Sequence, residues 1–174
     1  MRVLVTGGVR SGKSHHAEGL VADRVAVAYV APGPAPTADD ADWTARVAAH
    51  RARRPASWTT HETADLAGVL DAAPGPVLID CLGTWVTALV DDADLWEAPT
   101  EKVEVHVHTA LDRLVRALRE RDDVVVVTNE VGWGVVPSHR SGRVFRDALG
   151  TVNRVVAAVC DEVHLVVAGR VLVL

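Results

Sequence analysis

Several residue types are scarce in this chain of 174 residues. It has two cysteines, one methionine, one phenylalanine and one tyrosine, and no apolar run approaches the roughly 20 residues that a membrane-spanning helix needs. Cys81 and Cys160 stand in apolar surroundings and form no metal-ligand pattern, so we expect reduced thiols. The apolar run 3–5 is far too short for a signal peptide. These absences predict a cytoplasmic protein without a membrane span.

Positive charge is also in short supply. The chain carries 18 Lys and Arg against 23 Asp and Glu, a formal net charge of −5. A general nucleic-acid binder concentrates basic residues, and we therefore expect no nucleic-acid partner. The length suits a single domain, 1–174, which can bury a core without disulfides or a structural metal.

What the chain does have is a regular alternation of short apolar runs with helix-length segments. The apolar runs are β-branched and have no polar face, as is typical of strands buried on both sides of a parallel sheet. The predicted strands are 2–6, 27–31, 76–80, 123–128, 163–168 and, after a glycine, a terminal hairpin strand at 170–174. The predicted helices are 13–22, 40–52, 64–72, 84–90, 101–121 and 141–159. Strand then helix, repeated, predicts an α/β fold with a mostly parallel sheet flanked by helices.

Two segments interrupt this alternation. APGPAPTADDAD, residues 31–42, and DDADLWEAPT, residues 91–100, are rich in proline and aspartate. Such compositions predict mobile loops or edge segments.

The stretch GGVRSGKS is the most specific short pattern. Its spacing, Gly7-x4-Gly12-Lys13-Ser14, matches a P-loop and lies between a predicted strand and a predicted helix. In a P-loop the backbone N–H groups cradle phosphates, the lysine reaches the β- and γ-phosphate oxygens, and the hydroxyl ligates Mg²⁺. We therefore expect Lys13 to be catalytic. The residues expected to bind nucleotide here are Gly7, Gly8, Val9, Arg10, Ser11, Gly12, Lys13 and Ser14.

Asp80 ends the apolar run PVLID, at the carboxyl edge of a predicted strand. A carboxylate at that place holds Mg²⁺ in P-loop enzymes. Strands often end in aspartate, so Asp80 is informative only together with the P-loop. The pair predicts a Mg²⁺ site formed by Ser14 and Asp80.

The segment RVAAHRARRPASWTTHE, residues 46–62, surrounds His50 with four arginines. One interpretation is a charged, solvated helix in which His50 has no special function. The other is chemical, because a neutral imidazole can attack an α-phosphorus while guanidinium groups stabilise the developing charge. The residue types alone leave both interpretations open.

Four blocks, taken in order, resemble one family. They are GGVRSGKS, then R-x-x-x-H-R-x-R-R-P followed by W-x-T-x-E, then LIDCLGTWVTAL, and finally TNEVGWGVVP with RVFRDALGTVN. Together they span nearly the whole chain and resemble the bifunctional adenosylcobinamide kinase / adenosylcobinamide-phosphate guanylyltransferase family of cobalamin biosynthesis. The resemblance implies a RecA-like P-loop NTPase fold.

The resemblance also implies two reactions. ATP or GTP would phosphorylate the hydroxyl of the aminopropanol arm of adenosylcobinamide. GMP would then pass from GTP to that phosphate through a covalent GMP-histidine, giving adenosylcobinamide-GDP and pyrophosphate.

Particular residues take roles by the same resemblance. His50 matches the histidine that carries GMP, and the family assembles as homotrimers. The further nucleotide contacts that the resemblance implies are Ala31, Pro32, Gly33, Arg51, Ala52, Arg53, Arg54, Glu62 and Asp80.

The chain departs from the family pattern at several positions. Val9 replaces alanine in the P-loop, Trp133 replaces methionine, and Ser138-His139 replaces Glu-Asn. The segment NEVG, residues 129–132, follows directly on a predicted strand and should lie near the active edge of the sheet, so the last two changes bear on substrate contacts or on the subunit interface. Two other functions are consistent with a P-loop: a single-function small-molecule kinase, which forms no covalent nucleotide adduct, and a non-catalytic GTP sensor.

Overall fold

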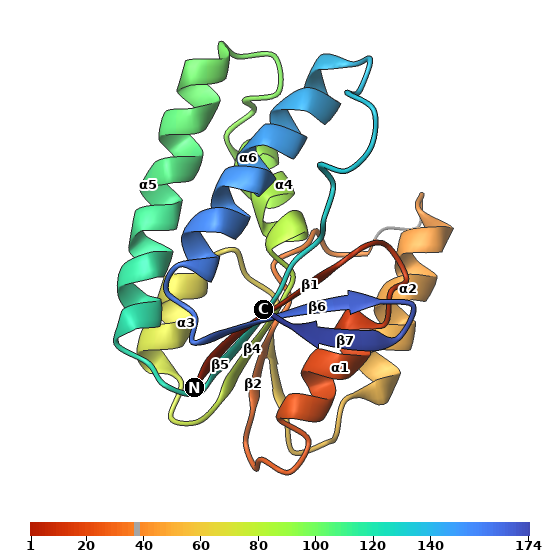
Figure 1. Ribbon diagram of the computed structural model, residues 1–174, viewed down its shortest axis with the longest axis vertical. Helices are drawn as coiled ribbons and strands as arrows, with labels where there is room; N and C mark the ends of the chain where they lie inside the picture. The colour runs from red at the N-terminus through yellow and green to blue at the C-terminus, as the bar shows by residue number, and fades with distance from the viewer. Residues whose placement is uncertain (37–38) are drawn as a thin grey trace.

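The computed structural model describes residues 1–36 and 39–174, so the predicted loop 31–42 lies partly outside the described residues at 37–38. The described chain forms one seven-stranded sheet in the order β3-β2-β4-β5-β1-β6-β7, flanked by helices (Figure 1). Neighbouring strands are parallel except β6 and β7, which form an antiparallel hairpin. The predicted α/β class, the mostly parallel sheet and the terminal hairpin are confirmed.

The strands are β1 (Arg2–Gly7), β2 (Ala28–Val30), β3 (Thr59–His61), β4 (Val77–Asp80), β5 (Val124–Val127), β6 (Glu162–Val167) and β7 (Arg170–Val173). The helices are α1 (Lys13–Leu20), α2 (Ala41–Arg53), α3 (Leu66–Ala72), α4 (Leu82–Asp92), α5 (Thr100–Arg119) and α6 (Arg140–Ala157). In the described part of the chain, none of these helices is long and apolar enough to cross a membrane.

Two parts of the sequence prediction need correction. Strand β3 was not predicted, because its three residues are polar and mostly exposed, yet it pairs with β2 at the sheet edge. The segment 91–100, predicted as a mobile loop or edge segment, is a loop only over residues 93–99, because α4 continues to Asp92 and α5 begins at Thr100. Leu95 within this loop is only 5% exposed. Arg140 donates hydrogen bonds to the carbonyls of Trp96 and Ala98.

The sheet residues alternate between two cores. Leu4, Ile79 and Val126 belong to the larger core, where α3, α4, α5 and α6 cover one face of the sheet. The next residues along two of these strands, Val5 and Val127, belong to the smaller core. Helix α1 contributes to this smaller core. Figure 1 shows α1 and α2 on the side of the molecule away from the other four helices. The strands are apolar throughout because both faces are covered.

The C-terminal hairpin supports the turn that follows β1. Strand β6 pairs with β1 along its length, and Gly169 N, in the hairpin turn, donates a 2.9 Å hydrogen bond to Ser11 O. A Cβ on Gly7 would lie 2.4 Å from Val166 O, so only glycine fits between these strands. The glycine-rich turn after β1 therefore packs against residues 166–169.

Candidate active site

The glycine-rich turn brings a helix N-terminus to the carboxyl edge of the sheet. Gly12 caps α1 with φ +97°, a conformation that favours glycine, and no side chain caps the helix. The first turn of α1 contains no acidic residue. Its N–H groups and the positive end of the helix dipole therefore favour an anion at this point.

Lys13 is buried at the start of α1, with 6% of its surface exposed. Its Nζ donates a 3.1 Å hydrogen bond to Gly8 O, across the turn. Burial lowers the pKa of Lys13, and the neighbouring Asp80 opposes that shift. The turn thus holds an amine inside the molecule, close to where the helix N-terminus favours phosphate.

Asp80 places a carboxylate beside this lysine. Its side chain ends β4 and is 8% exposed. Tyr29, from β2, donates a 2.9 Å hydrogen bond from its hydroxyl to Asp80 Oδ2. Burial raises the pKa of Tyr29 well above its ordinary value, so the hydroxyl keeps its proton and remains a donor.

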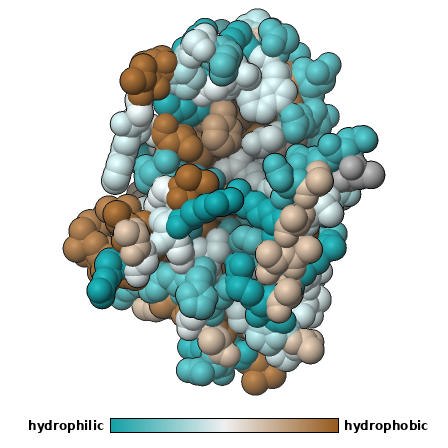
Figure 2. All heavy atoms as spheres, turned by 90° about the vertical axis from the view of Figure 1, so that its right-hand side faces the viewer, coloured by the Kyte–Doolittle hydropathy of each residue, from teal (hydrophilic) through white to brown (hydrophobic). Residues whose placement is uncertain are grey.

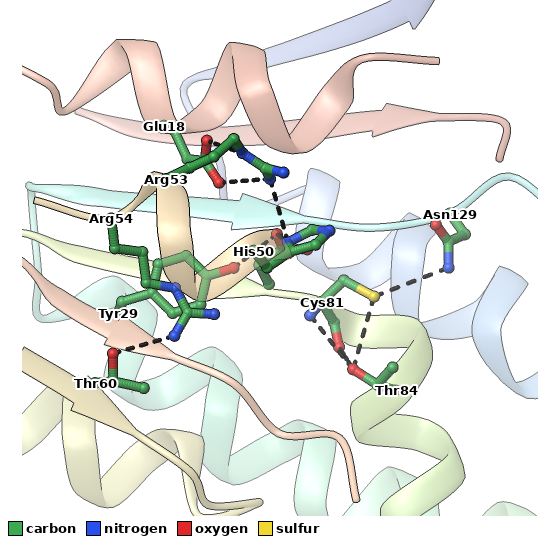
Figure 3. A network of polar contacts seen from close by, with 10 residues as sticks. Glu18, Tyr29, His50, Arg53, Arg54, Thr60, Cys81, Thr84 and Asn129 are labelled. Atoms are coloured by element: carbon green, nitrogen blue, oxygen red, sulfur yellow. Dashed lines mark hydrogen bonds and ion pairs between the residues drawn. The ribbon is translucent and has the colours of Figure 1, made fainter. Parts of the chain in front are cut away.

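His50 reaches the same carboxylate from α2. Its Nδ1 lies 3.7 Å from Asp80 Oδ2. The same atom lies 3.3 Å from Arg53 Nη2 (Figure 3). Burial lowers the pKa of His50; Asp80 opposes this shift and Arg53 adds to it. The imidazole is therefore neutral near pH 7, which is the protonation state a nitrogen nucleophile requires.

Helix α2 has no buried residue, and ion pairs link it to two other segments. Arg53 forms a bidentate pair with Glu18 of α1, with N–O distances of 2.9 and 3.0 Å. Arg51 pairs with Glu62 after β3. These contacts, rather than an apolar face, hold His50 in place.

Arg54, just beyond α2, adds a further link. It lies 3.6 Å above the Tyr29 ring and donates a 3.1 Å hydrogen bond to Thr60 Oγ1. Figure 3 shows His50 between the Arg53–Glu18 pair and the sheet edge that carries Cys81.

A cavity of about 160 Å³ opens between α2, the P-loop and the sheet edge. Among the predicted site residues, its lining contains Lys13, Ser14, Ala31, Gly33, His50, Arg54, Glu62 and Asp80. An adjoining cleft is lined by Arg10, Ser11, Gly12 and Arg53, again with Lys13, Ser14 and His50. Arg51 lies on a further groove with Arg54 and Glu62. The structure thus brings together most residues that the sequence singled out.

Five predicted contacts lie outside these linings. Gly7 is buried at the end of β1, and the Gly8 carbonyl accepts the Lys13 hydrogen bond. Val9 is 77% exposed, Pro32 is buried and Ala52 is exposed. Gly7 and Gly8 shape the turn, whereas the side chains of the other three are not brought to the cavity.

Several cavity residues were missed by sequence reasoning. The missed residues are Tyr29, Trp43 and Thr84, which lie in predicted strands or helices, and Cys81, which lies between two predicted elements. Asn129 also lines the cavity, from the segment just after β5. The sequence placed this segment near the active edge, because parallel strands present their carboxyl ends at one edge of the sheet.

The segment after β5 is tied to the P-loop strand. Thr6 Oγ1 donates a 2.7 Å hydrogen bond to Glu130 Oε1, and Glu130 N donates to Gly7 O at 3.2 Å. Glu130 therefore holds this segment against β1. The altered residues Trp133, Ser138 and His139 are exposed and outside the cavity lining.

Ser14 and Asp80 fit the requirements of a magnesium ion. Both line the cavity, and both offer hard oxygen donors. The described residues contain no cluster of three or more acidic, histidine or cysteine side chains that would enclose a metal. Mg²⁺ needs no such cage, because it is ordinarily held by one or two protein oxygens together with substrate phosphates and water.

A glycine-rich turn leading into a helix, a buried lysine, and a serine and an aspartate on the same cavity define a P-loop nucleotide-binding protein. A neutral histidine from a separate helix, His50, lines the same cavity.

Comparison with known proteins identifies the family. The family described as cobinamide kinase / cobinamide phosphate guanyltransferase matches residues 3–174, and the chain belongs to this family. It is 41% identical over 180 residues to the bifunctional adenosylcobalamin biosynthesis proteins CobU of Salmonella typhimurium and of Escherichia coli, covering 97% of each chain. It is 39% identical over 176 residues to CobP of Pseudomonas aeruginosa, covering 97% of this chain and 94% of the relative.

Proposed function

We propose that this protein carries out both reactions for which its family is described. It phosphorylates adenosylcobinamide with ATP or GTP, and it then transfers GMP from GTP to adenosylcobinamide phosphate. The observation that carries the proposal is the position of His50, which shares one cavity with Lys13, Ser14 and Asp80 although it lies on a separate helix. A P-loop kinase needs the last three residues but has no use for a neutral histidine there.

In the kinase step, the turn and the α1 N-terminus bind the triphosphate, and Lys13 stabilises charge on the transferred phosphoryl group. Ser14 and Asp80 would hold Mg²⁺, which would neutralise phosphate charge when bound. The corrinoid hydroxyl attacks the γ-phosphorus and the nucleoside diphosphate leaves. Positioning and charge stabilisation supply most of the rate in such transfers.

In the guanylyl step, a ring nitrogen of His50 attacks the α-phosphorus of GTP. The new N–P bond forms as the bond to the β-phosphate oxygen breaks, and pyrophosphate leaves. The phosphate oxygen of adenosylcobinamide phosphate then attacks the same phosphorus, and the N–P bond breaks to give adenosylcobinamide-GDP. One nucleotide site thus serves two phosphorus atoms.

The test is labelling with GTP that carries radioactive phosphorus at the α position. We expect wild-type protein to acquire an acid-labile, alkali-stable label, and His50→Ala to acquire none while it still transfers phosphate from γ-labelled ATP to adenosylcobinamide. His108→Ala is the matched control, because His108 is exposed on α5. Kinase activity without a label in the wild type would indicate a single-function kinase; nucleotide binding without either transfer would indicate a sensor.

We further propose that the protein acts as a homotrimer. Strand β7 supports an assembly, because Val171, Leu172 and Val173 are 42–57% exposed on an edge strand. Figure 2 shows hydrophobic side chains collected along one edge, beside a hydrophilic face. Light scattering after gel filtration should give three times the chain mass; Leu172→Lys should lower that value.

A further inference from the structure

The Nδ1 atom of His50 has two polar neighbours, one that requires this nitrogen to carry a proton and one that requires it to carry none. Arg53 Nη2 lies 3.3 Å from it and Asp80 Oδ2 lies 3.7 Å from it (Figure 3). A guanidinium only donates hydrogen bonds, whereas an ionised carboxylate only accepts them. Contact with Arg53 therefore needs Nδ1 without a proton, and contact with Asp80 needs Nδ1 with one. In a neutral ring these are the two different tautomers.

Glu18 holds Arg53, rather than Asp80, as the closer neighbour of His50 Nδ1. Its side chain is 12% exposed and binds Arg53 through both carboxylate oxygens. It lies four residues after Ser14 on α1, so both side chains project from one face of that helix. Arg53 follows His50 by three residues on α2, also about one turn away. The pair therefore joins the P-loop helix to the histidine helix and holds the guanidinium against Nδ1.

In this arrangement neither ring nitrogen of His50 is free to attack. While Nδ1 accepts the hydrogen bond from Arg53, its lone pair is occupied and the ring proton is on Nε2. Attack through Nε2 requires that Arg53 move away and that the ring proton transfer to Nδ1. Asp80 would then accept the hydrogen bond from Nδ1–H. The hydroxyl of Tyr29, already bonded to Asp80 Oδ2, holds that carboxylate in place.

Resting on the function proposed above, we infer that Glu18 and Arg53 are positioning residues that keep His50 in the unreactive Nε2–H tautomer until a triphosphate binds. The phosphate oxygens compete with Glu18 for the guanidinium, which lines the same cleft as Lys13 and Ser14. Bidentate binding to phosphate is the contact that a guanidinium favours. Once Arg53 turns to the phosphates, Nδ1–H bonds to Asp80 and the Nε2 lone pair is free. Nucleophile and substrate are then assembled in the same event.

The direct test is ¹⁵N NMR of histidine-labelled protein, in which the two ring nitrogens report the tautomer. The His50 signals are assigned by their loss in His50→Gln. Without nucleotide, we expect the Nε2–H tautomer in the wild type and the Nδ1–H tautomer in Arg53→Met, which cannot donate. An Nδ1–H wild type, or an unchanged tautomer in Arg53→Met, would overturn the inference.

Release is tested with a GTP analogue that has a methylene group between the α- and β-phosphorus, so that pyrophosphate cannot leave. Adding it to the wild type should convert His50 from Nε2–H to Nδ1–H. A bound analogue that leaves the tautomer at Nε2–H would exclude release by the triphosphate.

The kinetics of label formation test whether Glu18 positions Arg53 or only supports the structure. Glu18→Ala leaves Arg53 available to phosphate, so we expect the KM of GTP for label formation to fall about tenfold, as the cost of an unproductive conformation is removed. The rate of labelling at saturation should stay within about twofold. A fall in that rate with unchanged KM would contradict the inference.

The control is Arg113→Met, which removes an exposed ion pair with Asp65. It should alter neither the tautomer nor labelling. If the wild type forms no GMP label, the proposed function fails whatever the spectra show. If the label forms and the tautomer ignores Arg53, only the present inference fails.

Discussion

The two helices on either side of the candidate active site are built in different ways. Helix α1 follows directly on β1 and buries Lys13 and Ala17 against the sheet. Helix α2, which carries His50, buries no residue and is held by ion pairs and hydrogen bonds. Ala17 is completely buried in the core between α1 and the sheet, whereas exposed ion pairs contribute only about 0–1 kcal/mol. The phosphate-binding turn and α1 are therefore fixed, whereas α2, which carries His50, can be displaced at a small cost in free energy.

This difference suits the two reactions proposed above. In that proposal, the phosphate-binding turn holds a triphosphate in both reactions. His50 approaches the α-phosphorus in the guanylyl step and leaves room for the corrinoid hydroxyl in the kinase step. A weakly attached helix permits that exchange without repacking a core.

Hydrogen exchange should give the largest contrast between the well-packed and weakly packed parts of the molecule. Helix α5 buries seven residues and α2 buries none, so we expect backbone amides of α2 to exchange at least about 1,000 times faster than central amides of α5. Mass spectrometry of peptic peptides measures both helices in one experiment. Comparable protection would show that α2 is anchored by something beyond the contacts described.

Lys13→Met tests the fixed side chemically. In the proposed function both reactions use the same phosphate site, so we expect kinase activity and GMP labelling to fall together by about 100- to 1,000-fold. The measurements are phosphate transfer from γ-labelled ATP and label retention from α-labelled GTP. Loss of one reaction with retention of the other would indicate separate phosphate sites.

Leu118→Ala and Val47→Ala compare the two regions by stability. Leu118 is fully buried on α5, and its truncation should lower the free energy of unfolding by about 2–5 kcal/mol. Val47 lies on α2 and is only partly buried, so its truncation should cost under about 1 kcal/mol. Urea unfolding followed by circular dichroism measures both. Equal losses would mean that α2 contributes to the core after all.

The pH dependence of GMP labelling should be the smallest effect. Burial lowers the pKa of His50 below its ordinary value of 6.5, and only the unprotonated ring attacks phosphorus. The midpoint of the decline in label formation should therefore lie below pH 6.5. Rapid-quench measurement from pH 8 to 5 tests the direction. A midpoint above pH 6.5 would mean that Asp80 outweighs burial.

Sequence patterns predicted the phosphate-binding side of the site better than the side that α2 forms. The P-loop is a local motif, and β1 and β4 are apolar runs, so both could be read directly from the chain. Strand β3 could not, because Thr59–His61 has neither apolar character nor alternation. The sheet recruits it through backbone hydrogen bonds to β2.

The site shows the same division. Lys13, Ser14 and Asp80 follow from motif and strand position, whereas the Tyr29–Asp80–His50 contact joins three segments that no local pattern connects. Glu18 was also outside sequence reasoning, because its importance comes from meeting Arg53 across two helices. The position of Asn129, in contrast, could be predicted, because a residue just beyond a parallel strand lies at the active edge of the sheet.

The support that the C-terminal hairpin gives to the P-loop has a consequence for synthesis of the protein. The glycine turn is synthesised well before its neighbours β5, β6 and the 166–169 segment. The nascent chain therefore carries its most recognisable motif for a time without the strands that shape it. We expect nucleotide binding to begin once these later strands have closed around β1, so that the turn becomes functional among segments made after it.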